Sequence, residues 1–501
     1  MKHQPDNLPG PPAETARPSG NKNTILNGRI LVLQAVILLG ANLAYEAAGV
    51  CYTRFTGLTW DWHFIDLGPL RSSLLEGLFY MHIQPPVYNF YIGLLVQLLG
   101  DHAYMGLALG NLTLGFGAFA GGYYVMRRLG ISTKVAMLLT GAFVVSPSFI
   151  LLGHAAAYDF PVAALVIIAA AVAFRMLDTG RISTSLLFFS IIALLCGTRS
   201  MFHIVYLLAV ILLLWIMRPD LRRVILTGSS VPLLFVFSIY AKNYVVFGKF
   251  TASSWMGMNA AKVLYRSTTP DVREQWYREG VVSDVFLVEP WSDLDMYPER
   301  FRTAGEFTDI EVLGRKRKAS GYKNLNHVAY IALSDQYLKD VLSVIRTHPG
   351  AEAFGILAAW YCYFRATDES MFLPYIENVQ PMVDFYDYVL YGKLPVHLMH
   401  GGKEYNIYLF LLLLLPLLFL FGVMLALGKG KTGRTLTGDQ RIVIAFMCFT
   451  VLYVAVIVNA FELAENQRAR FYTDLFSLVF LGIALETMLL PRLRKVLRRR
   501  G

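Results

Sequence analysis

Repeated apolar runs, each roughly twenty residues long, constrain this chain more than any other feature of its sequence. Such a run is long enough to cross the ~30 Å hydrocarbon core of a bilayer as a helix. Of the 501 residues 55% are hydrophobic and only 16% are charged, which is more apolar surface than a soluble domain can bury. Because only closed backbone hydrogen bonding is stable in lipid, we expect an all-α polytopic membrane protein.

About ten crossings are predicted. A further apolar run at 87–99 is too short to cross, and we interpret it as an interfacial or re-entrant helix. The predicted crossings are about 29–50, 104–126, 133–153, 160–176, 183–198, 201–217, 224–245, 405–427, 441–460 and 471–490.

The basic residues give this arrangement its orientation. Loops such as those with Arg127 and Arg128, or with Arg222 and Arg223, fall on one side, which the positive-inside rule makes the cytoplasmic side. Both termini are then predicted to be cytoplasmic. Counting 87–99 as a full crossing would send most of these basic loops outward. The net charge of +10 therefore reflects membrane topology, and nucleic acid is not expected as a partner.

The domain organisation follows from the same pattern. The four cysteines are scattered, without a C-x-x-C pair, so neither a metal site nor a disulfide framework is predicted. We expect a disordered cytoplasmic tail at 1–28, a transmembrane catalytic module at 29–246 with a first outer loop at 51–103, an outer domain with an interfacial helix at 247–404, C-terminal transmembrane helices at 405–490 and a basic tail at 491–501. Whether 351–364 enters the membrane stays open.

Polar and charged residues gather at the predicted outer ends of the crossings. Ionisable groups at a membrane boundary are costly, so their concentration on one face predicts a functional site. A carboxylate can accept a proton from a hydroxyl, and arginine or lysine suits a phosphate. The residues are Asp66, Arg71, His82 and Gln84 in the first outer loop, Tyr158 and Asp159 in the second, Arg199, Lys242, and the group Glu465, Arg468 and Arg470.

Structural interpretations stand beside these roles. Asp66 and Asp159 each precede a predicted helix and could be N-caps. Arg199 and Lys242 could be charges at helix ends that reach to the interface. Glu465 and Arg468 could form a helical ion pair.

The segment His82-Ile83-Gln84-Pro85-Pro86-Val87-Tyr88 resembles the K/H-x-PP-aromatic motif of the GT-C superfamily of multi-spanning glycosyltransferases. The most similar group is that of the protein mannosyltransferases and aminoarabinose transferases. The resemblance covers roughly residues 29 to 250 and the 460s; the outer domain matches no family. Two positions depart from the pattern: Ile65-Asp66-Leu67 replaces an Asp-Glu pair, and Gln84 stands where a lysine is common.

The resemblance implies an inverting membrane glycosyltransferase. It would transfer a sugar from a polyprenyl-phosphate donor to a hydroxyl of a glycan, lipid or protein acceptor on the outer face of the membrane, here the bacterial inner membrane. Asp66 matches the family's catalytic aspartate and Asp159 the second acidic residue, with Asp61 kept as an alternative base. The basic residues at 199 and 242 and the stretch 465–470 resemble phosphate- and donor-facing positions.

No metal site is predicted, although two acidic groups in one cavity leave a divalent cation open. The alternative function is a polytopic transporter or lipid flippase, which would carry charges at mid-span or broken helices in matching halves. A membrane scaffold whose outer domain binds a partner is a further reading.

Overall fold

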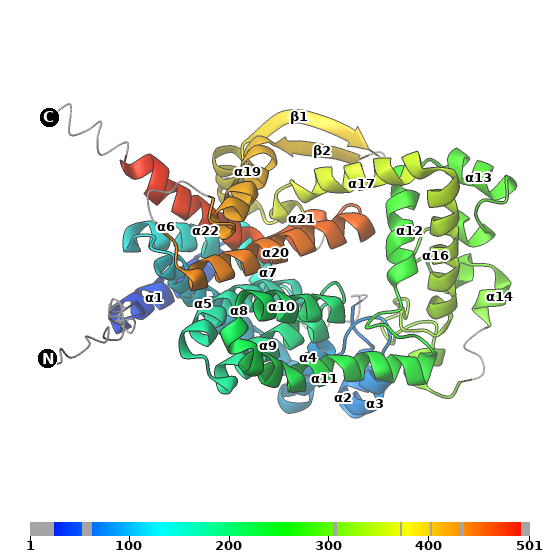
Figure 1. Ribbon diagram of the computed structural model, residues 1–501. Coiled ribbons are helices and arrows are strands. Elements are labelled where there is room, and N and C mark those ends of the chain that lie inside the picture. The colour runs from blue at the N-terminus through cyan, green and yellow to red at the C-terminus, as the bar shows by residue number, and fades with distance from the viewer. Residues whose placement is uncertain are drawn as a thin grey trace, which may run out of the picture.

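The computed structural model describes residues 25–52, 63–303, 308–370, 373–400, 403–429 and 435–491 (Figure 1). For 395–400 and 403–405 only the backbone is described. Most of the predicted N-terminal tail, nearly all of the basic C-terminal tail and Asp61 lie outside these ranges.

A bundle of long apolar helices makes up most of the fold. Seven helices or helical stretches of the described chain are long and apolar enough to cross a membrane, and two shorter apolar helices, α9 and α10, lie among them. The bundle contains α1 (Gly28–Ala47), α5 (Ala103–Arg128), α6 (Thr133–Val144), α7 (Pro147–His154), α8 (Asp159–Thr179), α9 (Ile182–Thr198), α10 (Ile204–Met217), α11 (Arg222–Phe247), α19 (Leu409–Ala426), α20 (Gly438–Phe461), α21 (Asn466–Arg470) and α22 (Asp474–Ala484).

Each of the ten predicted crossings therefore has a helical counterpart, and the prediction of an all-α polytopic membrane protein is confirmed. The crossing predicted at 133–153 is broken. Ser146 caps α7 by accepting the N–H of Phe149, Pro147 opens that helix, and α6 and α7 meet at 50°.

The apolar run at 87–99 forms a separate helix, α4 (Val87–Leu99). It ends at Gly100, whose φ of 55° suits glycine. From α4, Tyr91 donates a hydrogen bond to the Gly106 carbonyl at 3.4 Å, and its hydroxyl lies so close to Gly110 that a Cβ there would clash. The chain thus turns back, and α4 packs against the start of α5.

Close helix contacts in the bundle rely on small residues. A Cβ at Gly228 of α11 would lie 2.3 Å from the Ser185 hydroxyl of α9, and one at Gly422 of α19 would meet the Phe480 ring at 2.8 Å. In lipid, helices gain little from apolar burial alone, so such close packing supplies much of their association.

The region that follows the bundle's first half, called the outer region here after its predicted position, is built from shorter elements. It contains α12 (Met256–Ser267), α13 (Pro270–Arg278), α14 (Glu299–Arg302), α15 (Glu311–Gly314), α16 (Ala329–Thr347), α17 (Pro349–Tyr363), α18 (Gln380–Asp384) and the antiparallel strands β1 (Lys393–His400) and β2 (Lys403–Tyr408). The helix at 349–363 packs on α12 and α16 and along α20 and α21. The short helices η7 (Thr367–Glu369), η8 (Glu377–Val379) and η9 (Phe385–Leu390) complete it.

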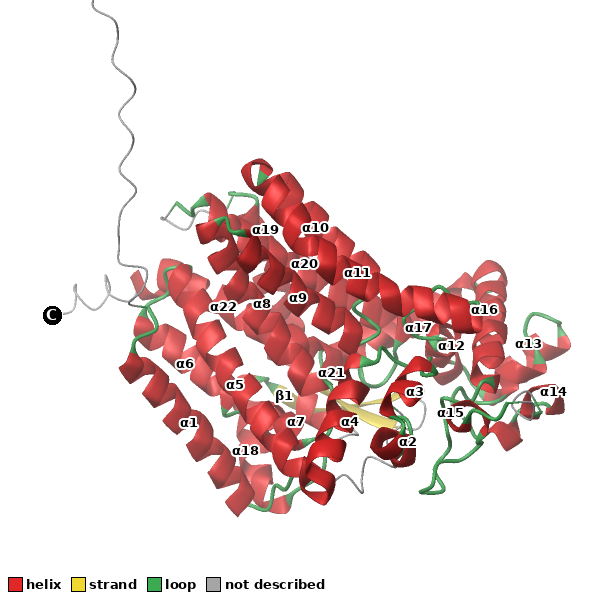
Figure 2. Ribbon diagram, turned by 90° about the horizontal axis from the view of Figure 1, so that it is seen from below, coloured by secondary structure: helices red, strands yellow, loops and turns green. Residues whose placement is uncertain are grey.

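Two large apolar cores and two smaller apolar clusters lie among the described residues. One large core lies within the bundle, and the other joins the first outer loop to α12, α13 and α16. The loop contributes α2 (Leu67–Ser72) and α3 (Leu74–Phe79). Figure 2 shows α5, α8, α9 and α20 side by side, with α12, α13 and α16 beyond one end of the bundle. The start of α1 and the end of α22 lie on the opposite side of the molecule (Figure 1).

Candidate functional site

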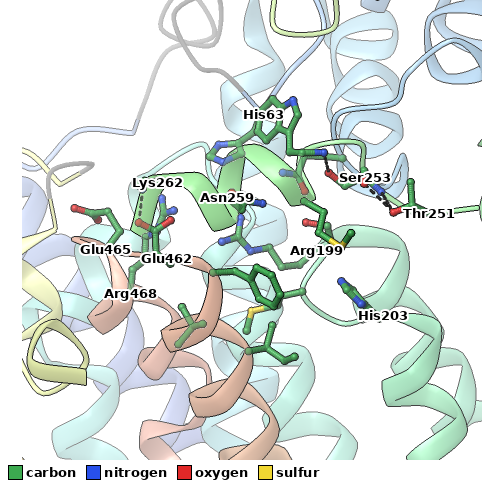
Figure 3. Close-up of a pocket in the computed structure, with 18 of the residues that line it drawn as sticks. His63, Arg199, His203, Thr251, Ser253, Asn259, Lys262, Glu462, Glu465 and Arg468 are labelled. Carbon is green, nitrogen blue, oxygen red and sulfur yellow. Dashed lines mark hydrogen bonds and ion pairs between the residues drawn. The ribbon is translucent and has the colours of Figure 1, made fainter. Parts of the chain in front are cut away.

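A cavity of about 1030 Å³, including its open mouth, lies where the bundle meets the outer region. Its walls come from segments far apart in the sequence (Figure 3). The lining residues are His63 and Gln84 from the first outer loop, Arg199, Ser200, Met201 and His203 between α9 and α10, Thr251, Ser253, Trp255, Met256, Asn259, Lys262 and Trp291 from the outer region, and Ile457, Val458, Phe461, Glu462, Glu465 and Arg468 from α20 and the turn after it.

The turn after α20 is held by a side-chain clamp. Asn466 donates hydrogen bonds to the Asn459 side chain at 2.9 Å and to the Glu462 carbonyl at 2.8 Å. It also accepts the N–H of Ala464 at 3.1 Å, and Ala464 has a φ of 116°. Holding a non-glycine residue in this region costs about 1–3 kcal/mol, and such strain clusters at functional sites. The clamp aims Glu462, Glu465 and Arg468 at the cavity.

Arg199 gives the cavity a cationic wall. It follows the last residue of α9, and its guanidinium lies 4.4 Å from the centre of the Tyr158 ring. Its Nε is buried without a hydrogen-bond partner, and it forms no ion pair with a carboxylate of the described chain. Burial lowers the pKa of Arg199 from its ordinary value, although an arginine stays charged at neutral pH. An anion in the cavity would supply the missing partner.

Arg468 is held in place by Asp159, which lies behind the cavity wall. Its guanidinium lies 3.6 Å from the Asp159 carboxylate, and Tyr472 donates a hydrogen bond to the other oxygen of Asp159. Asp159 is almost fully buried, with 1% of its surface exposed. It is the first residue of α8 and makes no side-chain cap there, so the N-cap interpretation does not describe it.

Lys262 and Glu462 form an ion pair that joins α12 to the end of α20. One turn further along α12, Arg266 donates to the Leu463 carbonyl at 3.2 Å. Burial alone would raise the pKa of Glu462, but Lys262 and Arg266 outweigh it and hold that pKa below the ordinary range. Glu462 is therefore a charged structural partner at neutral pH.

Glu465 is the second carboxylate on the cavity wall. It accepts a hydrogen bond from the Ser370 hydroxyl at 2.6 Å, and 6% of its surface is exposed. The outer region and the first loop also supply aromatic surface to the cavity. The Trp255 and Trp291 rings meet at 6.0 Å, and His63 packs edge-on against Tyr158 at 4.7 Å.

Four residues predicted from the sequence line this cavity, namely Gln84, Arg199, Glu465 and Arg468. Tyr158 and Asp159 lie directly behind it, in contact with Arg199 and Arg468.

The other predicted residues are not part of the lining. Asp66 caps α2 by accepting the Leu67 N–H at 2.7 Å and also accepts the Ala319 N–H at 2.7 Å. Arg71 is exposed and pairs with Asp101 at 3.1 Å. The catalytic role predicted for Asp66 therefore belongs to a carboxylate that already accepts two backbone donors.

His82, Lys242 and Arg470 join separate segments of the fold. His82 joins the first loop to the outer region, Lys242 joins α11 to the first loop, and Arg470 joins α21 to the end of α17. His82 contacts the Ser254 hydroxyl at 2.6 Å and the Asn326 carbonyl at 3.0 Å, and burial lowers its pKa to about 3. Lys242 donates to the Met81 carbonyl at 2.6 Å. Arg470 forms an ion pair with Asp474 at 3.0 Å. It also donates to the backbone carbonyls of Tyr363 and Arg365, near the end of α17.

Sequence reasoning missed the outer-region half of the site. Lys262, Asn259 and the two tryptophans carry no local pattern that marks them as lining residues. Glu462 could have been predicted from the sequence, because it begins the polar stretch that also contains Glu465 and Arg468. Within the described residues no group of three or more His, Cys, Asp or Glu side chains is arranged to hold a metal ion.

Comparison with known proteins gives one structural similarity. No family model matches the chain, and no curated protein matches it. The chain is similar to the crystal structure of ArnT from Cupriavidus metallidurans bound to undecaprenyl phosphate, with 14% identity over 91% of this chain and 78% of that one. The TM-score is 0.30, so the roles of the cavity residues rest on their own geometry.

Proposed function

We propose that the protein is an integral membrane glycosyltransferase that uses a polyprenyl-phosphate sugar as donor and acts at this cavity. The supporting observation is Arg199, a half-buried cation on the cavity wall whose ion-pair capacity no carboxylate of the described chain takes up. A guanidinium in that state matches the phosphate of a lipid-linked donor, which it can grip bidentately. The motif resemblance at 82–88 points to the same donor class.

In the proposed reaction the acceptor oxygen attacks the anomeric carbon as the bond from that carbon to the phosphate oxygen breaks. The hydroxyl proton passes to a carboxylate, and the lipid phosphate leaves with an additional negative charge. Arg199 and Arg468 stabilise that charge where it develops. Attack opposite the leaving group inverts the anomeric centre.

The base is proposed from two candidates. Asp66 is the residue that matches the family motif, but its carboxylate already binds two backbone N–H groups away from the lining. Glu465 lines the cavity. A base must reach the proton that it accepts, so we favour Glu465 as the base. Under this proposal Asp159 acts through Arg468, as a positioning residue.

We propose transfer on the outer face, which is periplasmic if the source is bacterial, because the cavity lies at the Arg199 end of α9 and the basic loop with Arg181 precedes the other end. The acceptor, whether glycan, lipid or protein, would approach along the wall that bears the tryptophans. The transporter or flippase alternative has one feature in its favour, the broken helix pair α6–α7, but no residue of that pair lines the cavity.

The test is release of free polyprenyl phosphate from a panel of polyprenyl-phosphate sugars by full-length protein in nanodiscs. We expect Arg199→Ala to lower the rate about 100-fold, as loss of an oxyanion donor does. Arg278→Ala, an exposed substitution on α13, is the matched control and keeps full activity. Equal rates for both variants would contradict the phosphate role.

The same assay separates the two bases. Glu465→Gln is expected to lower release by roughly 100-fold or more. Asp66→Asn keeps an oxygen for the Leu67 cap and loses the acceptor for the Ala319 N–H, so it is expected to lower release much less than Glu465→Gln does. Loss of release in Asp66→Asn, with Glu465→Gln active, would return the base to Asp66.

A further inference from the structure

A second pocket lies on the other side of the segment that carries Ser370. It holds about 430 Å³ including its mouth and is lined by Leu151, Asp368, Leu373, Pro374, Tyr375, Ile376, Val379, Gln380 and Val383. It shares no lining residue with the first cavity. Apart from Asp368 and Gln380 its walls are apolar or aromatic.

Asp368 is an unusual group to find in such a pocket. Both of its carboxylate oxygens are buried and have no hydrogen-bond partner. A buried polar atom without a partner costs roughly 1–3 kcal/mol, and most are satisfied by protein or water. Gln380 does not satisfy it, because its side-chain amide donates to Asp384 at 2.9 Å.

The charged residues near Asp368 form ion pairs with one another, and none of these pairs includes Asp368. Three ion pairs surround it: Glu369 with Arg365 at 2.7 Å, Asp387 with Lys393 at 2.9 Å, and Asp474 with Arg470 at 3.0 Å. Four described acids therefore face three described bases. Asp368 is the acid without a base, and it lies at the pocket.

We propose that this pocket binds a primary ammonium group carried on an apolar body, with Asp368 as its counter-ion. An ammonium has three N–H donors, enough to reach both free oxygens, and it supplies the missing positive charge. The apolar walls would cover the body that carries it. A single carboxylate is too few ligands for a divalent cation, and no group of three ligating side chains lies there among the described residues. This site is separate from the proposed transfer reaction and does not depend on it.

The position of the pocket allows two sources for the ammonium. Its walls rest on the ends of two bundle helices: Asn378 donates to the Ala48 carbonyl after α1 at 3.2 Å, and Tyr386 donates to the Ala142 carbonyl of α6 at 2.7 Å. Tyr375 is 77% exposed and Phe385 50% exposed beside it, as side chains at a lipid interface are. The ammonium could belong to an ethanolamine lipid headgroup or to a soluble amine.

Binding should release a proton. Burial, reinforced by Asp387 and Glu369, raises the pKa of Asp368 well above its ordinary range, which favours the neutral acid in the empty pocket. An ammonium ligand favours the carboxylate and displaces that proton. The other ionisable groups near it are Lys393, Arg470, Tyr45, Tyr391 and Tyr408.

The experiment is calorimetric titration of full-length protein in phosphatidylcholine nanodiscs with n-hexylammonium chloride, in two buffers of different ionisation enthalpy. We expect one saturable site, about one proton released per ligand and no comparable binding of 1-hexanol. Asp368→Asn should weaken binding roughly tenfold or more and abolish the proton release. The matched control is Asp271→Asn, on the exposed face of α13, which should bind as the wild type does.

A second variant guards against a folding defect at Asp368. Val383→Phe narrows the pocket and leaves the carboxyl in place, and it should also weaken hexylammonium binding. Absence of saturable binding to the wild type, equal binding of hexanol, or full binding by Asp368→Asn would each overturn the proposal. Replacing half of the lipid by phosphatidylethanolamine distinguishes the sources: competition identifies a lipid headgroup, and unchanged affinity identifies a soluble amine.

Discussion

At the scale of single residues, the contact between Asp159 and Arg468 gives a prediction that separates positioning from catalysis. Asp159→Asn removes the charge that holds Arg468 at 3.6 Å and leaves the shape of the side chain unchanged. We expect release of polyprenyl phosphate to fall about 10-fold, the size of one modest charge-assisted contact. In an Arg468→Ala background the same substitution should cause little further loss, because residues that act through one another are not additive.

The contrary result is equally clear. Independent, multiplicative losses in the double variant would give Asp159 a direct role in the chemistry, as the resemblance of the sequence to the glycosyltransferase family implies. Tyr472→Phe, which removes one donor to Asp159 and leaves both charges in place, is the control and should have a smaller effect than Asp159→Asn.

At the scale of elements, the ion pair between Lys262 and Glu462 is the link between α12 and α20. Its partners are 200 residues apart in the chain and both are largely buried. Removing one partner of such a pair costs roughly 3–5 kcal/mol, because the other charge stays buried and unpaired. We expect Glu462→Gln to lower the thermal unfolding midpoint, and the exchange Lys262→Glu with Glu462→Lys to recover at least half of the loss. A double variant as unstable as the sum of its singles would contradict a direct pair. Arg278→Ala, which removes an exposed pair on α13, should leave the midpoint unchanged.

Helices were predictable at this scale and the site only in part. A helix such as α8 or α20 is specified by a continuous apolar run, so hydropathy locates it within a few residues. The contacts of Asp66 depend on Ala319, 253 residues further along the chain, and no local pattern encodes that packing. The turn at 462–468 could be predicted in part. Its polar residues stand out in the sequence, but the hydrogen bonds of the Asn466 clamp, which direct Glu465 into the cavity, do not.

At the scale of the whole molecule, function on the outer face requires that α13 and the basic loop before α9 lie on opposite sides of the membrane. Arg278 on α13 and Arg181 before α9 are both exposed, so a cysteine at either position would be reachable by solvent. Cys51 is the one exposed cysteine among the described residues and would be replaced first by serine. In intact cells we expect a membrane-impermeant maleimide to label Arg278→Cys and to leave Arg181→Cys unlabelled until the membrane is permeabilised. The expectation rests on the excess of lysine and arginine in the loops on the Arg181 side.

The reverse labelling pattern would put the cavity on the cytoplasmic face, where Arg199 would meet donors from the opposite leaflet, and would contradict transfer at the outer surface. Labelling of both positions in intact cells would report a leaky or an unfolded preparation. Cys448, which is buried inside the bundle, reacts only after unfolding and therefore separates the two.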